Sequence, residues 1–327
     1  TQLNDRTAQI HSDGFDIQDR SGPLAIKLAA GGLKTDVATL EPLVTGKLVA
    51  DLAGKISKEE ISLDQGTLRS DALNASLTAT VSLTDLAMKL KMNADAVSSA
   101  LPPQVRSVLG ERVTFSATAS RDPQGSFAAN SLSLTSGSLS ASGTASAQGS
   151  DIQADVKGTL GDVSALSSLA GTPLAGGINF TLTASGPRFA PDFSVAADSA
   201  SLTAAGRTVK DIKLSAKGKA DIASPQADIA LTGSVEEQPL DIRASLVTSN
   251  GKRSIKGLSL SLGDNKVSGD LALDDHLLPQ GTLTLAVPDI APLAALGGPK
   301  ATGDINGPPA FAQEGEGPTF SHHAARG

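Results

Sequence analysis

The feature of this sequence that most restricts its fold is an alternation of apolar and polar residues with a period of two. The alternation is clearest at Ile178, Phe180, Leu182 and Ala184, which are separated by Asn, Thr and Ser residues. Successive side chains of a β-strand point to opposite faces of a sheet, so this pattern predicts strands with one apolar and one polar face. The pattern recurs in residues 212–216, 227–231, 240–246, 267–273 and 283–287.

Turn-forming residues separate these segments, roughly every ten to fifteen residues along the chain. Examples are Gly186-Pro187, Asn250-Gly251 and Pro279-Gln280-Gly281. Short turns between one-sided strands favour pairing of each strand with the next one in the sequence. The sequence therefore predicts a mainly β fold in which the strands form an antiparallel meander.

The composition limits how thick such a fold can be. The chain has 327 residues, of which 39% are hydrophobic, but it has no Trp or Tyr and only 8 Phe. A compact domain of about this size normally fills its core with large aromatic rings. A thin sheet needs only small aliphatic side chains, so we expect an elongated, curved antiparallel sheet with a repetitive architecture.

A short non-strand element, Asp-φ-x-x-Leu-x-x-Leu, returns at long and regular intervals. It begins at Asp36, Asp162 and Asp289, so the copies are 126 and 127 residues apart. An Asp at a helix N-cap accepts hydrogen bonds from free backbone N–H groups, and the apolar residues that follow would lie on one face of a helix. We predict three short amphipathic helical inserts with these aspartates as their N-caps, and a looser copy that begins at Asp95.

The strands next to the inserts repeat as well. Residues 132–143 (LSLTSGSLSASG) match residues 258–269 (LSLSLGDNKVSG) at an offset of 126. We expect residues 1–307 to form one repetitive β segment with a period of about 126 residues. Residues 308–327 lose the alternation and gain Pro and Gly, which predicts an irregular or truncated tail.

The sequence offers little that could support catalysis. It has no Cys, and its 4 His residues have no metal-ligand spacing. Neither a GxSxG nucleophile elbow nor a phosphate-binding glycine loop is present. With 27 basic against 34 acidic residues, the net charge of −7 argues against nucleic-acid binding. We therefore expect no enzyme activity, no cofactor and no metal site.

The remaining chemical feature is the apolar face of the strands. In one interpretation these faces pack on one another as a dry interior, which is the usual fate of amphipathic strands. In the other, the sheet curls into an open groove that binds aliphatic chains, because each methylene that leaves water gains about 0.8 kcal/mol. The candidate lining residues are Ile178, Phe180, Leu182, Ile212, Leu214, Ile229, Leu231, Leu240, Ile242, Leu246, Leu271, Leu273, Leu283 and Leu285.

Three stretches of the sequence resemble a known protein family. They are TDVATLEPLVTGKLVADLAG from Thr35, GDVSALSSLAGTPLAGGINFTLTASG from Gly161 and GTLTLAVPDIAPLAALGGPKATGDING from Gly281. In these stretches the sequence resembles the TamB family, the AsmA-like inner-membrane subunit of the bacterial translocation and assembly module. The resemblance covers about residues 20–307 and consists of rhythm and composition, since the family has no catalytic signature.

The resemblance implies a U-shaped β-groove that crosses the periplasm of a Gram-negative bacterium and carries phospholipid acyl chains towards the outer membrane. It also implies a role in assembly of outer-membrane proteins and autotransporters, with an outer-membrane partner of the Omp85 type. The full-length protein would be anchored in the inner membrane. This sequence lacks the family's anchor and its C-terminal partner-binding domain, so we expect an interior segment of the groove.

The alternative is a structural protein, such as a β-solenoid adhesin or an autotransporter passenger with a dry interior. Such a chain usually repeats every 20 to 30 residues or so, whereas the period found here is near 126. A hydrolase is a more distant alternative, because it would need a cluster of Ser, His and carboxylate side chains.

Overall fold

The structure is a computed structural model. It describes residues 6–11, 16, 18, 20–31, 46–98, 106, 109–167, 171–204, 206–221, 223–249, 251–273, 279–289, 305–307, 310–312 and 319–321. The chain divides into two compact units, Thr1–Gly161 and Asp162–Gly327.

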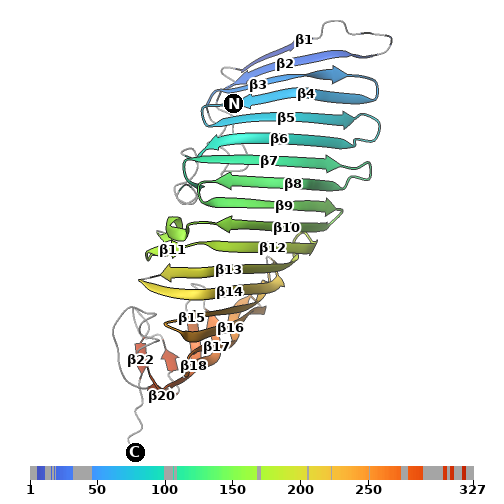
Figure 1. Cartoon of the computed structure of the whole chain (residues 1–327). Helices are drawn as coiled ribbons and strands as arrows, with labels where there is room; N and C mark the ends of the chain where they lie inside the picture. Colours follow the sequence, from blue (N-terminus) through green and yellow to red (C-terminus); the bar gives the residue numbers. More distant parts are fainter. Residues whose placement is uncertain are drawn as a thin grey trace, which may run out of the picture. The chain divides into compact units, whose positions relative to one another are not determined.

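The first unit is an antiparallel meander in which each strand pairs with the next one along the chain (Figure 1). Its strands are β1 (Arg6–His11), β2 (Gly22–Ala30), β3 (Leu48–Ile56), β4 (Glu60–Arg69), β5 (Leu73–Ser82), β6 (Met88–Val97), β7 (Arg112–Arg121), β8 (Phe127–Ser136), β9 (Leu139–Gln148) and β10 (Asp151–Leu160).

The second unit begins with a short 3-10 helix, η2 (Val163–Leu166), and continues as a meander from β12 to β19. Its strands are β11 (Leu174–Gly176), β12 (Ile178–Pro187), β13 (Asp192–Ala204), β14 (Arg207–Lys219), β15 (Gln226–Val235), β16 (Gln238–Ser249), β17 (Lys252–Leu262), β18 (Asn265–Leu273), β19 (Pro279–Val287), β20 (Ile305–Gly307), β21 (Ala310–Ala312) and β22 (Thr319–Ser321). Both β11 and β12 pair with β13.

The predicted fold class is therefore confirmed, since both units are antiparallel and mainly β. The U-shaped groove stays a prediction. The predicted tail, residues 308–327, contains the two three-residue strands β21 and β22, which pair with each other.

The two edges of the first unit differ in the connections that they carry. At one edge, which we call the insert edge, the long connections join Ala30 to Leu48 and Val97 to Arg112. The opposite edge, which we call the turn edge, has short turns between β3 and β4, β5 and β6, β7 and β8, and β9 and β10. The buried side chains of the described residues follow this difference, because Ser98, Val113, Ser136 and Leu160 all lie at strand ends on the insert edge.

The second unit has the same arrangement around the ends of β15 to β19. Val235, Leu240 and Leu262 form a buried cluster there, and the half-buried Val209, Leu231 and Ile242 pack against it. Leu262 is fully buried, and Asn265 and Val287 beside it are almost so. In this unit we also use the name insert edge for these strand ends, and turn edge for the opposite ones.

Candidate functional site: an apolar sheet face

The structure places all the predicted groove residues on strands of the second unit. Ile178, Phe180 and Leu182 lie on β12, while the others lie on β14, β15, β16, β18 and β19. In an antiparallel sheet, directly opposed residues point to the same face, so the register shows whether these side chains share a face.

The register brings all these candidates to one face of the sheet. One continuous row of opposed residues runs across eight strands and consists of Phe180, Ala197, Leu214, Leu231, Ile242, Leu260, Val267 and Leu285. The other candidates are an even number of positions from a member of this row on their own strand, so they point the same way. This surface is the apolar face of the second unit.

The side chains of the apolar face are only partly buried. Leu240 and Leu271 are buried, whereas Leu182 and Ile229 are exposed at 37% and 38% of their surface. The remaining candidates are half-buried. A closed sandwich would bury such a row far more completely, so this face keeps apolar surface that is accessible to an apolar ligand.

The predicted lining residues left out two strands of this face, β13 and β17, and all strands of the first unit. Val195 and Ala197 on β13 show the same alternation as their neighbours. In the first unit, a comparable row consists of Ile26, Leu52, Gly66, Leu77, Met92, Ala117, Leu132, Gly143 and Val156. Each unit therefore presents an apolar face of its own.

Four β-bulges keep these faces continuous where the alternation breaks. The register shifts by one residue within β4, β8, β14 and β17. On β17, Ile255 and Leu258 are three positions apart and would point to opposite faces of a regular strand. The extra residue at Lys256-Gly257 returns both side chains to the apolar face.

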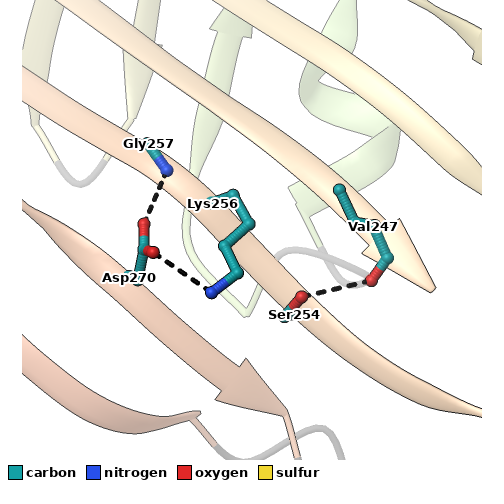
Figure 2. Close-up of polar contacts among 5 residues, drawn as sticks. All are labelled: Val247, Ser254, Lys256, Gly257 and Asp270. Carbon is teal, nitrogen blue, oxygen red and sulfur yellow. Dashed lines mark hydrogen bonds and ion pairs between the residues drawn. The ribbon is translucent and has the colours of Figure 1, made fainter. Parts of the chain in front are cut away.

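Asp270 on the neighbouring strand β18 holds the β17 bulge in place (Figure 2). Its Oδ1 accepts a hydrogen bond of 2.8 Å from the Gly257 N–H, and its Oδ2 lies 3.1 Å from Lys256 Nζ. These two contacts, the Gly257 bond above all, lower the pKa of the Asp270 carboxyl. Gly257 has a φ of 57°, which a glycine adopts without strain.

Of the predicted N-cap residues, Asp162 caps a helix in the described part of the chain. Its Oδ1 accepts a 2.8 Å hydrogen bond from the Ser164 N–H at the start of η2. The pKa of Asp162 is lowered by its hydrogen bonds with the Ser164 hydroxyl and backbone. Val163, the first residue of η2, is almost fully buried.

The other predicted insert positions have different outcomes. Asp36 lies outside the described residues. Asp289 follows β19, and its N–H donates a 3.2 Å hydrogen bond to Asn265 Oδ1, but the residues that would form its helix also lie outside the described part. The prediction that Asp95 begins an insert was wrong: it lies inside β6, where its carboxylate accepts a 3.0 Å hydrogen bond from Thr114 Oγ1.

The opposite face of the second unit is polar. Lys217 lies across from Asp228, and Asp198 lies across from Lys213. Asn179 Nδ2 donates a 3.0 Å hydrogen bond to Asp198. Such exposed contacts contribute little to stability, so their main effect is to keep this face wet and to fix which face is apolar.

In the described part of the chain, no group of three or more His, Asp or Glu side chains could hold a metal ion. No helix among the described residues has the length and apolar character needed to span a bilayer.

Comparison of the chain with protein-family models, with curated proteins and with solved structures finds no match.

Proposed function

We propose that this chain is a segment of a bridge-like lipid carrier whose apolar faces bind the acyl chains of phospholipids. The observation that supports the proposal is the unbroken apolar row across β12–β19, whose members stay largely half-buried. Ala, Leu, Val and Ile offer a wall without polar groups, and an acyl chain gains free energy simply by leaving water.

The bulges support the same proposal. A sheet that needed only a stable fold would tolerate a polar position where the alternation slips. Here an extra residue in β17 restores the apolar row at the cost of a locally disrupted ladder. Continuity of the apolar face is a property that a bound chain running across the strands requires.

The wider setting is proposed on the resemblance to the TamB family. In that setting the protein lies in the periplasm, and its full-length form is anchored in the inner membrane. It supports phospholipid transport and outer-membrane protein assembly together with an outer-membrane partner.

The test compares two double variants that differ only in the face they alter. Leu182→Asp with Ile229→Asp places charges at exposed positions of the apolar face, where folding tolerates them best. Thr181→Asp with Thr232→Asp places the same charges at exposed positions of the polar face. Mass spectrometry of solvent extracts gives the lipid per mole of protein, and circular dichroism checks the fold.

We expect the wild type and the polar-face variant to carry copurifying phospholipid, and the apolar-face variant to lose most of it. Wild-type protein without lipid, or equal loss in both variants, would overturn the proposal. The apolar faces would then be structural contact surfaces, as in a solenoid adhesin.

A further inference from the structure

One cation interrupts the apolar face of the first unit. The outermost row on the turn edge consists of Ile56, Ile61, Val81, Met88, Arg121, Phe127, Ala147 and Ile152. Arg121 lies directly between Met88 and Phe127 in this row. It is the one charged residue that the register places on the apolar face of β2–β10.

The guanidinium group of Arg121 is held in place on one side. Its Nη1 donates a 2.6 Å hydrogen bond to the Leu86 carbonyl and a longer one, 3.4 Å, to the Asp122 carbonyl. The group also lies over the Phe127 ring, 5.8 Å from its centroid. These contacts fix the plane of the guanidinium without using its other nitrogens.

The other side of the guanidinium is open. Among the described residues, neither Nε nor Nη2 donates a hydrogen bond, and no ion pair includes Arg121. Gly125 lies next to this side, since a Cβ there would be 3.4 Å from Nη2, an ordinary van der Waals contact. The nearby carboxylates of Asp85 and Asp122 accept hydrogen bonds from the backbone of their own turns and form no ion pair with Arg121. The pKa of Asp85 is lowered mainly by hydrogen bonds with Ser82 and Ala87 and to a smaller degree by the charge of Arg121.

Part of the surroundings of Arg121 is apolar and exposed. Phe127 is 51% exposed and Leu86, in the β5–β6 turn, is 57% exposed. Leu86 has a φ of 59°, an unfavourable conformation for a branched side chain, and the Arg121 bond to its carbonyl helps to hold it. The planar guanidinium of Arg121, with Nε and Nη2 as free donors, therefore lies beside accessible apolar surface.

The second unit also has an arginine on the turn-edge row of its apolar face. Arg253 occupies the turn-edge row of its apolar face, between Thr248 and Leu273. It is exposed, and its side chain makes no hydrogen bond or ion pair within the described part of the chain. Among the described residues, each unit therefore has one arginine on the turn-edge row of its apolar face.

We propose that Arg121 is the head-group site for an anionic amphiphile whose aliphatic tail lies on the apolar face, with Arg253 in the same role in the second unit. A guanidinium binds two oxygens of a carboxylate or phosphate side by side, and Nε and Nη2 provide that pair of donors. The inference rests on the proposed function, since it requires the apolar face to bind the tail.

The test measures binding of amphiphiles that share one tail and differ in the head group. Delipidated full-length chain is equilibrated by dialysis with labelled palmitate, hexadecanol or palmitoyl lysophosphatidate at pH 8, where both acids are ionised. We expect the wild type to bind palmitate about tenfold more tightly than hexadecanol, the scale of one charge-assisted hydrogen bond. The lysophosphatidate result shows whether a carboxylate or a phosphate is preferred.

Arg121→Gln and Arg253→Gln should each remove the preference at one of the two sites, and the double variant should lose most of it, while hexadecanol binding stays unchanged in all three. Arg121→Lys should keep part of it, because the charge remains without the paired donors. The matched control is Arg112→Gln, which alters the same strand on its polar face and should change nothing. Unchanged hexadecanol binding also shows that the variant is folded.

The outcomes separate this inference from the proposed function. If hexadecanol and palmitate bind equally well to the wild type, or if Arg121→Gln weakens both equally, the head-group site is refuted and the apolar tail site stands. If the wild type binds none of the three amphiphiles, the proposed function fails and the head-group site fails with it.

Discussion

Two segments of the molecule, one in each unit, have the same strand arrangement but are stabilised at the insert edge by different contacts. The first is β8–β10, and the second is β17–β19. Their residues correspond at an offset of 126 or 127. Both contain a bulged strand, at Asn130-Ser131 and at Lys256-Gly257, followed by a hairpin turn with a glycine at positive φ.

The contacts at the insert edge differ between the two segments. In the first, the buried Ser136 donates its hydroxyl to the Leu109 carbonyl. In the second, the equivalent residue is Leu262, which packs in the apolar cluster with Val235 and Leu240. In the second segment the polar contact is made by Asn265 instead. Its side chain donates a hydrogen bond to the Leu262 carbonyl and accepts one from the Asp289 N–H.

The comparison shows which features the architecture depends on. The positions of the apolar residues, the bulge and the glycines are kept, whereas the groups that close the edge have been exchanged. The face is therefore set by the apolar pattern, and each insert edge is stabilised by whatever contact its own residues allow.

The largest difference between the segments should appear when the two equivalent edge residues are shortened. Leu262→Ala removes a fully buried side chain and leaves a cavity, so we expect a loss of about 2–5 kcal/mol. Ser136→Ala removes one hydrogen bond and leaves the Leu109 carbonyl unpaired, for a loss of about 1 kcal/mol. Urea unfolding measures both losses, and hydrogen exchange of β17 and β18 locates the first.

Ser133→Ala is the control for this pair, because Ser133 is an exposed residue on the polar face of β8 and should be neutral. Equal losses for Leu262→Ala and Ser136→Ala would contradict the view that the two edges are closed by different kinds of contact.

The shared features should respond alike in the two segments, with an intermediate effect. Gly143 and Gly269 correspond, and a Cβ at either would overlap the backbone carbonyl oxygen of the neighbouring strand, that of Asp155 or Thr282. Alanine at either position should therefore force the strands apart and destabilise its unit by about 1–3 kcal/mol, towards the upper end at Gly269, which also has a φ of 156°. Thermal unfolding of Gly143→Ala and Gly269→Ala provides the measurement.

Gly31→Ala is the matched control, since an added Cβ there meets nothing within 4 Å and the residue has no positive φ. If only one of the two strand glycines were sensitive, close approach of the strands would not be a common property of the repeat.

Much of this architecture could be predicted from the sequence, because it follows from local patterns. The period-two alternation identified one-sided strands, and the register places Phe180, Leu214 and Leu285 in one row. The Asp-φ-x-x-Leu-x-x-Leu pattern identified Asp162, whose carboxylate bonds to the start of η2. Both signals act over a few residues of the chain.

The contacts that escaped prediction depend on register or on distant residues. The three-residue spacing from Ile255 to Leu258 was the visible signal for a bulge, but an interrupted alternation also fits a strand end. In the sequence, nothing distinguishes Arg121 from other charged residues. Only its pairing with Met88 and Phe127 in the structure shows that it lies on the apolar face. Asp95 shows the opposite error, since an Asp before apolar residues fits a strand end as well as an N-cap.

The smallest predicted effect concerns the bond that holds only one of the two bulges. Asp270 binds the Gly257 N–H, whereas the equivalent residue of the first segment is Thr144, which cannot ionise. The lowered pKa of Asp270 means that its contribution to stability is present above the ordinary Asp pKa of about 3.9. That contribution is lost as the pH falls through the lowered value.

Nuclear magnetic resonance of the two bulge amides between pH 6 and pH 2 measures this difference. The Gly257 amide shift should titrate with a midpoint below about 3.9, the ordinary Asp value, and the Ser131 amide should show no such step. In Asp270→Asn the Gly257 step should vanish, and its amide should exchange faster with solvent because the charged acceptor is gone. A Gly257 step that persists in Asp270→Asn would mean that another group senses the pH, which would contradict the role given to Asp270.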